Sequence, residues 1–279
     1  MVGQSSISRI EIINFRLPAS IATVPERRTK AFVADDYRRK EREMDSERRR
    51  FLTRSIVGAM AVGAGGAVRT AFAMPKTERD ALSPTQIIEL MKRGNERFRM
   101  GVRVNRDFLR EQQDRAKSQF PAAVILSCID SRAPAELVMD LGIGDVFNTR
   151  MAGNVANSDV VGGLEFACSV AGAKVILVLG HTACGAVAGA IDGVKLGSLT
   201  GLLARIEPAV KATRHEGPRT SKDAAFVDAV ARTNVEMTMR AVRSESQVLR
   251  DLEAKGALVI AGAMYDLGNA AVTFLPPHQ

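Results

Sequence analysis

Two short apolar runs, residues 122–126 and 175–179, constrain the fold of this chain more than any other feature. Neither run alternates with polar residues, which is typical of strands buried on both faces of a parallel sheet. Each run leads into a polar motif: Cys128-Ile129-Asp130-Ser131-Arg132 after the first and His181-Thr182-Ala183-Cys184-Gly185 after the second. Open α/β sheets bind ligands at the carboxyl ends of their strands. Two neighbouring strands would therefore bring the two motifs together.

Helical and strand patterns alternate from residue 74 onward and predict an α/β fold with a central, mostly parallel β-sheet flanked by helices. Ser83 and Pro84 are typical of a helix start, and we expect an N-terminal helical arm there. Its apolar stripe consists of Ile87, Ile88, Leu90, Met91 and Phe98. The other predicted helices span 134–140, 158–171, 186–191 and 224–255. The other predicted strands span 146–149, 258–264 and 272–275, the last as an antiparallel edge strand.

The positive charge of the chain lies mainly in its N-terminal segment. The formal net charge is +8, and residues 1–73 hold 14 Lys and Arg against 8 Asp and Glu. The remaining 206 residues hold 25 against 23. A protein that binds nucleic acid carries its basic patch on the folded domain. We therefore expect no nucleic-acid partner.

The N-terminal segment has the layout of an export signal. A basic stretch, Arg48-Arg49-Arg50-Phe51-Leu52, resembles a twin-arginine motif, and a Gly/Ala-rich run over 55–68 and Ala71-Phe72-Ala73 follow it. We expect residues 1–43 to be a non-native or disordered extension, with Met44 as the true initiator. Residues 44–73 would form a twin-arginine-like signal peptide, and 74–279 the catalytic domain.

This signal predicts a periplasmic or secreted protein whose partners include the twin-arginine export machinery. The apolar run is shorter than the roughly 20 residues that cross a bilayer, so we expect no stable membrane span. Two alternatives remain. A basic leader without an export role would leave the protein cytoplasmic, and a mitochondrial transit peptide is disfavoured by the acidic residues of this leader.

The two motifs together offer the ligands of a metal site. Cys128, His181 and Cys184 supply two thiolates and an imidazole, the ligands that zinc prefers. Three protein ligands leave one position open, which is typical of catalytic rather than structural zinc. Taken singly, each residue is more simply explained as core or hydrogen-bonded structure. The third cysteine, Cys168, lies among apolar residues without ligand spacing, and we expect it to be a core residue.

Asp130 and Arg132 are the candidate catalytic pair. They lie two residues apart, so in an extended segment they point the same way. The guanidinium keeps the carboxylate charged and can orient it through two hydrogen bonds. A surface ion pair is the simpler interpretation of these two residues alone. Beside a zinc ion, an oriented carboxylate can accept a proton from bound water, whose pKa zinc lowers to about 7.

These residues resemble the β-class carbonic anhydrases, whose pattern is Cys-x-Asp-x-Arg followed about fifty residues later by His-x-x-Cys-Gly. Three further segments are similar to the family: Asn95-Glu96-Arg97-Phe98, Ala152-Gly153-Asn154, and the stretch from Ala261 to Asp266. The resemblance implies one zinc ion per chain and reversible hydration of carbon dioxide to bicarbonate through a zinc-bound hydroxide. It runs from Ser83 to Leu275.

The resemblance also implies a role for residues outside the ligand set. Gln119, nine residues before the first cysteine, and Gly185 would bind substrate. Gln119 favours the plant-type branch of the family, in which water is the fourth ligand and Asp130 stays on Arg132. In the other branch Asp130 itself is the fourth ligand. Ile129 replaces the usual small residue and can alter the shape of the pocket.

The family also implies a homodimer or a higher homo-oligomer, with the helix around Ile87 to Phe98 packed on the partner chain. Two other functions use the same motifs. One is hydrolysis of carbon disulfide or carbonyl sulfide on the same scaffold, and the other is a catalytically silent zinc-binding protein. A thiol redox role is disfavoured because the chain has no Cys-x-x-Cys motif.

Overall fold

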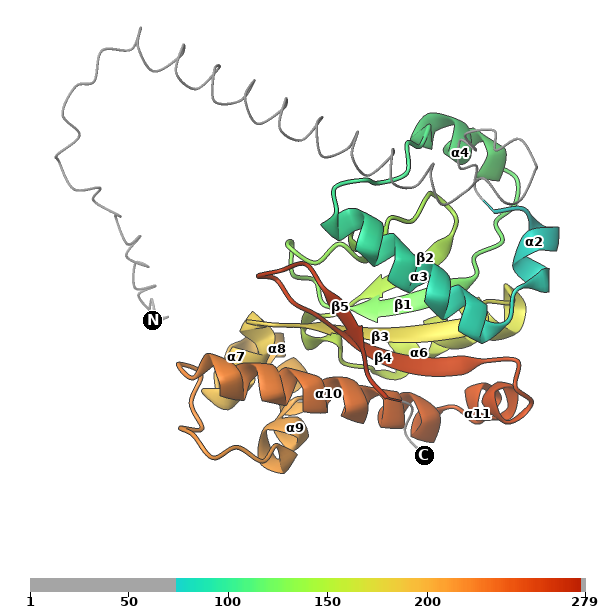
Figure 1. The fold of residues 1–279 in the computed structure, drawn as a ribbon. Coiled ribbons are helices and arrows are strands. Elements are labelled where there is room, and N and C mark those ends of the chain that lie inside the picture. Colours follow the sequence, from blue (N-terminus) through green and yellow to red (C-terminus); the bar gives the residue numbers. More distant parts are fainter. Residues whose placement is uncertain (1–73, 277–279) are drawn as a thin grey trace, which may run out of the picture. The chain divides into compact units, whose positions relative to one another are not determined.

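The structure, a computed structural model, describes residues 74–276. The predicted extension over 1–43 and the predicted signal peptide over 44–73 lie outside the described residues. Figure 1 shows a central sheet with helices packed against it. Its five strands are β1 (Ala123–Ser127), β2 (Val146–Arg150), β3 (Val175–His181), β4 (Val259–Tyr265) and β5 (Val272–Phe274).

The strand order is β2-β1-β3-β4-β5. The first four strands run parallel, and β5 pairs antiparallel with β4 at the edge. β1 and β3 are direct neighbours, with Ser127 paired to Leu179. The connection from β1 leads outward to β2, whereas β3 and β4 extend the sheet the other way. The carboxyl ends of β1 and β3 therefore form the switch point where such sheets bind ligands.

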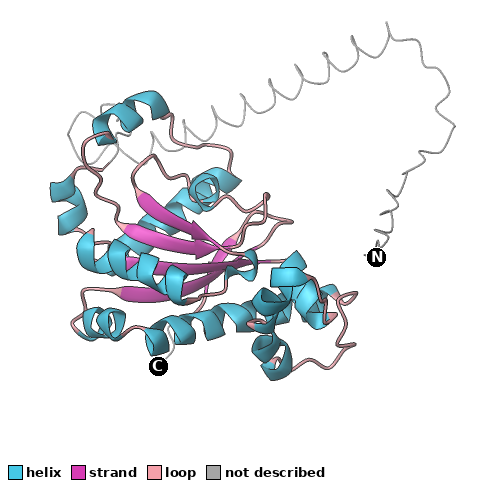
Figure 2. Ribbon diagram, turned by 180° about the vertical axis from the view of Figure 1, so that it is seen from behind, coloured by secondary structure: helices cyan, strands magenta, loops and turns pink. Residues whose placement is uncertain are grey.

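The helices cover both faces of this sheet, as Figure 2 shows from behind. In chain order, the helices before β3 are α2 (Lys76–Ala81), α3 (Pro84–Arg99), α4 (Phe108–Arg115), α5 (Ala135–Val138) and α6 (Ser158–Glu165). The helices after β3 are α7 (Gly185–Ile191), α8 (Gly197–Ala204), α9 (Glu207–Ala212), α10 (Ala224–Glu245) and α11 (Gln247–Ala254). Two single-turn segments, η1 (Ala152–Asn154) and η2 (Phe166–Val170), complete the described chain. None of the helices between residues 74 and 276 is both long and apolar enough to cross a membrane.

Alternate side chains of the buried strands enter two separate cores. Ile125 and Leu177 face α3 and α5, whereas Leu126 and Val178 face α6, α10 and α11. All five residues of β1 and all seven of β3 are buried. Burial on both faces explains why these runs do not alternate in the sequence.

A third core lies beyond the carboxyl ends of the strands. It joins α7, α8 and α9 to the first half of α10 and includes Phe226 and Val230. Two cysteines, Cys128 and Cys184, belong to the same cluster. The polar motifs are therefore set into the wall of an apolar core.

Helix α3 begins as the sequence predicts. The Ser83 side chain accepts from the Gln86 amide, and the Gln86 side chain accepts from the Ser83 amide, which forms a capping box. Ile87 and Met91 of its apolar stripe pack on the sheet of their own chain, whereas Leu90 is exposed. The expectation that this helix packs on a partner chain stays a prediction.

Two predicted helices are interrupted. The helix expected over 224–255 breaks at Ser246, whose side chain accepts from the Leu249 amide and starts α11. The helix expected over 158–171 changes at Phe166 into a wider turn, which ends in Gly172 with a positive φ. Ser246 thus divides the first predicted helix into α10 and α11, whereas the second continues from α6 into η2 and ends before Gly172.

Candidate metal centre

The three predicted metal ligands converge at the switch point of the sheet. Cys128 follows β1 directly, His181 is the last residue of β3, and Cys184 is the N-cap residue of α7. All three side chains are buried, and their ligand atoms all lie within 4.8 Å of one another. Cys184 thus lies immediately before the first turn of α7.

The geometry of these atoms fits a tetrahedral zinc ion. The two sulfur atoms are 4.0 Å apart, close to the ~3.8 Å expected for two thiolates on tetrahedral zinc with Zn–S bonds of about 2.3 Å. The Nδ1 of His181 lies 2.8 Å from the Thr182 carbonyl oxygen and donates to it. The buried Nε2 has no hydrogen-bond partner among the described residues. An imidazole held in this tautomer offers its Nε2 lone pair to a metal.

The ionisation of the two thiols is coupled, and a cation would favour the form in which both are thiolates. Hydrogen bonding to Cys184 lowers the pKa of Cys128. The same interaction, together with burial, raises the pKa of Cys184. One thiolate therefore forms easily and the second resists ionisation, because two buried negative charges repel. A divalent cation between the sulfurs removes that repulsion.

Asp130 and Arg132 form the predicted pair beside the ligands. The Asp130 Oδ1 accepts from the backbone amide of Arg132 at 2.9 Å and from its Nε at 3.0 Å, and Oδ2 accepts from Nη2 at 2.7 Å. The same Oδ2 lies 3.9 Å from the His181 Nε2. Hydrogen bonds from Arg132 lower the pKa of Asp130 to about 2. The carboxylate is therefore ionised at neutral pH and lies at the ligand cluster.

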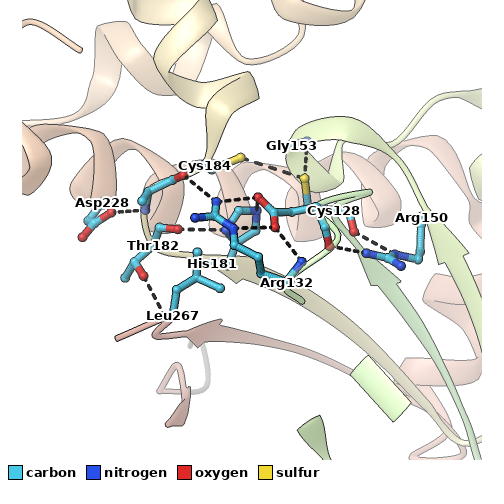
Figure 3. Close-up of polar contacts among 11 residues, drawn as sticks. Cys128, Arg132, Arg150, Gly153, His181, Thr182, Cys184, Asp228 and Leu267 are labelled. Atoms are coloured by element: carbon cyan, nitrogen blue, oxygen red, sulfur yellow. Dashed lines mark hydrogen bonds and ion pairs between the residues drawn. The ribbon is translucent and has the colours of Figure 1, made fainter. Parts of the chain in front are cut away.

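Backbone contacts support the loop that carries Cys128 and Asp130 (Figure 3). Arg150, at the end of β2, donates from Nε to the Cys128 carbonyl oxygen at 2.9 Å and from Nη2 to the Asp130 carbonyl oxygen at 2.6 Å. The Gly153 amide donates to the Cys128 Sγ at 3.3 Å. Arg150 is not among the site residues that the sequence predicts. Its place at the end of the strand beside β1 is the signal that could have identified it.

The predicted substrate-binding residues lie in different places. Gly185 directly follows Cys184, and a Cβ placed on it would meet nothing within 4 Å. Gln119 is exposed in the loop before β1, at the opposite end of the strand from Cys128. At about 3.3 Å per residue, the five residues of β1 alone separate the two by about 17 Å. The structure of one chain therefore does not bring Gln119 to the ligand cluster.

The two remaining residues from the sequence analysis have clear surroundings. Ile129 is 61% exposed, next to Asp130. Cys168 is buried in the core between the sheet and α6, and burial raises its pKa to about 12. Its burial among apolar residues confirms the expectation of a core cysteine.

Comparison with known proteins decides the family. Residues 123–272, which include every ligand, match the family described as carbonic anhydrase. Carbonic anhydrase 2 of Mycobacterium tuberculosis is 34% identical over 202 residues, covering 70% of this chain and 92% of the relative. The chain belongs to the carbonic anhydrase family. A carbonic anhydrase of Pseudomonas aeruginosa is 33% identical over 171 residues, covering 57% and 76%.

Solved structures identify the class within this family. The β-carbonic anhydrase CafA of Aspergillus fumigatus is 28% identical, with a TM-score of 0.53 over 60% of this chain and 81% of that one. A β-carbonic anhydrase of Sordaria macrospora is 27% identical, with a TM-score of 0.51 over 57% and 83%. This carbonic anhydrase therefore has the β-class fold, and the sequence-based family resemblance is confirmed.

Proposed function

We infer that this chain is a zinc enzyme that interconverts carbon dioxide and bicarbonate. The observation that carries this inference is the ionised, oriented carboxylate of Asp130 beside the Cys128, His181 and Cys184 cluster. These three residues would hold the ion. When bound there, zinc would act as a Lewis acid and lower the pKa of its bound water to about 7.

Three side chains beside the ligands, those of Asp130, Arg132 and Arg150, then have separate roles. The low pKa of Asp130 keeps its carboxylate ionised, so the carboxylate is free to accept a hydrogen bond or a proton from a group bound at the cluster. Arg132 orients that carboxylate through three hydrogen bonds and keeps it directed to the ligand cluster. Arg150 fixes the two carbonyl groups on either side of Ile129, so the loop cannot rotate Asp130 away. The apolar core behind the cysteines excludes water from the far side of the cluster.

We also propose that this carbonic anhydrase has the open, plant-type site. Arg132 binds both carboxylate oxygens of Asp130, which favours a site where Asp130 is not the fourth ligand. The fourth position is then available to water and substrate. Gly185, beside Cys184 and with open space above its Cα, is the proposed substrate-binding residue of this chain.

Stopped-flow measurement of carbon dioxide hydration tests the function. Asp130→Asn removes the proton acceptor and keeps the shape, and we expect kcat/KM at pH 7 to fall by at least about 100-fold. Asp114→Asn makes the same change at an exposed site on α4 and should leave the rate unchanged. An inactive wild-type protein with one zinc per chain would reject the inference. Assays with carbonyl sulfide and carbon disulfide would then be the next step.

We propose that the active enzyme is a homodimer or a higher homo-oligomer. The carbonic anhydrases of Sordaria macrospora are described as tetrameric. Gln119 supports the proposal, since it lies too far from Cys128 in one chain to reach the substrate there. A second copy would bring its Gln119 to the cluster. Light scattering on the zinc-loaded protein measures the oligomer, and a monomer with full activity would reject the proposal.

We propose, finally, that the enzyme is exported by the twin-arginine machinery to the periplasm or beyond. The support is the sequence layout of residues 44–73 alone. Replacing Arg48 and Arg49 by Lys in a tagged full-length protein tests this step. Export of the wild type with cytoplasmic retention of the variant supports the proposal. A wild-type protein found wholly in the cytoplasm would reject it.

A further inference from the structure

The turn between two of the ligands has an unusual backbone. His181 ends β3 and Cys184 begins α7, so only Thr182 and Ala183 connect them. Both ligands must nonetheless face the same point. The chain turns sharply at Ala183, whose φ of 51° lies in the left-handed region. An L-residue with a Cβ adopts this region only when its surroundings hold it there.

Different elements hold the two residues of this turn, as Figure 3 shows. Thr182 is fixed by the sheet: its amide donates to the Tyr265 carbonyl at 3.0 Å, and its Oγ1 accepts from the Leu267 amide at 3.0 Å. Ala183 is fixed from outside the sheet. Its amide donates to the Asp228 Oδ1 at 2.8 Å, and its carbonyl oxygen lies 3.5 Å from the Arg132 Nη2.

Asp228 lies on a helix that packs into the apolar core. It is half-buried in the second turn of α10, and its neighbours Val227 and Val230 are buried in the same core as Cys184. The Ala183 amide therefore binds a charged acceptor whose position the core determines. Hydrogen bonds to charged groups are stronger than those between neutral groups.

The same helix also supports the opposite side of the metal centre. Asn234 is buried on α10 and donates from Nδ2 to the Gly153 carbonyl oxygen at 2.7 Å. Gly153 in turn has a φ of 66° and donates its amide to the Cys128 Sγ. One helix thus binds a left-handed residue on each side of the ligands, Ala183 on the β3 side and Gly153 on the β1 side.

We propose that Asp228 is a positioning residue of the zinc site: its carboxylate holds Ala183 in the left-handed conformation and so sets the distance between His181 and Cys184. It acts through the backbone and takes no part in the chemistry. The proposal concerns metal binding and goes beyond the reaction inferred above. It can therefore fail while the reaction holds, and hold while the reaction fails.

Zinc affinity of the full-length protein, measured by competition with a coloured chelator, tests the proposal. Loss of a residue that supports a metal ligand weakens metal binding by about 10- to 100-fold, and we expect about tenfold for Asp228→Ala. Asp228→Asn keeps an acceptor oxygen at the same place, so we expect its affinity to stay within about threefold of the wild type. Asp114→Ala, on α4, is the control for loss of a carboxylate and should bind zinc normally.

The same measurement in an Ala183→Gly protein separates a positioning role of Asp228 from a general loss of stability. Glycine adopts the left-handed region without a steric cost. In an Ala183→Gly background, Asp228→Ala should therefore weaken zinc binding by less than about threefold. The cobalt-substituted protein adds a spectroscopic measure, because a displaced ligand shifts the visible bands of Asp228→Ala but not those of Asp228→Asn.

Three results would overturn the proposal. The first is an Asp228→Ala protein that matches the wild type in both zinc affinity and melting temperature. The second is a loss of affinity on Asp228→Ala that is equally large with and without the Ala183→Gly change. The third is a lower melting temperature with unchanged zinc affinity and cobalt spectrum, which is the pattern of a merely structural residue. Circular dichroism confirms that each variant is folded before it is compared.

Discussion

At the scale of residues, the Asp130–Arg132 pair shows how a surface motif becomes a functional one. An exposed ion pair contributes little to stability by itself. Here the backbone amide of Arg132 binds the same carboxylate as its guanidinium, so Asp130 is held by three bonds. The result is a charge with a fixed direction, 3.9 Å from the buried nitrogen of His181.

This geometry predicts how the pair responds to pH. The pKa of Asp130 is lowered from 3.8 to about 2 by the hydrogen bonds of Arg132. Its stabilising contribution is therefore complete above about pH 3.8 and disappears as the pH falls towards 2. We expect Arg132→Gln to raise the pKa of Asp130 towards 3.8. NMR titration of the labelled carboxyl carbon measures both values, and a midpoint that stays near 2 in the variant would contradict this account.

The sequence predicted the candidate metal ligands and the carboxylate beside them, which the structure brings together, but not the residues that support them. Cys128, His181, Cys184 and Asp130 could be predicted because each has a side chain suited to its chemistry and follows a recognisable strand. The supporting residues Arg150, Asp228 and Asn234 bind backbone amides and carbonyls. Such contacts leave no pattern in the sequence, since any residue supplies the partner atom. Only the folded chain shows that α10 passes beside both loops.

At the scale of elements, the strands were easier to predict than the ends of the helices. A strand buried on both faces consists of adjacent apolar residues, and β1 and β3 lie within two residues of their predicted bounds. The helix predicted over 224–255 contains no proline or glycine that would mark a break. Ser246 nevertheless ends one helix and caps the next, and its hydroxyl also donates to the Glu165 side chain. That distant partner favours the break, and the sequence does not reveal it.

Two glycines in helices are expected to respond oppositely to replacement by alanine. In α3, a Cβ on Gly94 would lie 1.9 Å from the Met139 carbonyl oxygen, a backbone atom that cannot easily move. Gly94→Ala should therefore destabilise the protein by about 3 kcal/mol. In α8, a Cβ on Gly201 meets nothing within 4 Å, and Gly201→Ala should stabilise by about 0.5–1 kcal/mol. Urea denaturation measures both changes. A Gly94→Ala protein as stable as the wild type would contradict the close contact with Met139, and a destabilised Gly201→Ala protein would contradict the open space at Gly201.

At the scale of the whole molecule, the two ends of the sheet carry different parts of the proposed site. The metal ligands gather at the carboxyl ends of β1 and β3, whereas Gln119 precedes β1 at the other end. A residue at that end can bind substrate only at the site of another copy. The fold of one chain therefore accounts for the candidate metal ligands and the proposed proton acceptor, and the assembly would account for substrate binding.

Mixed oligomers of two impaired variants test this division directly. One chain carries Asp130→Asn and the other Gln119→Ala, which alone should lower kcat/KM by about tenfold through the loss of one hydrogen bond. If Gln119 acts on the neighbouring copy, a mixed dimer contains one site with both native residues, and its activity rises towards half that of the wild type. The matched control pairs a wild-type chain with a chain carrying both changes. That dimer has no complete site if Gln119 acts between copies, and one complete site if it acts within its own chain. Activity in the control dimer without activity in the first would therefore place Gln119 in the site of its own chain, against the position seen in this fold.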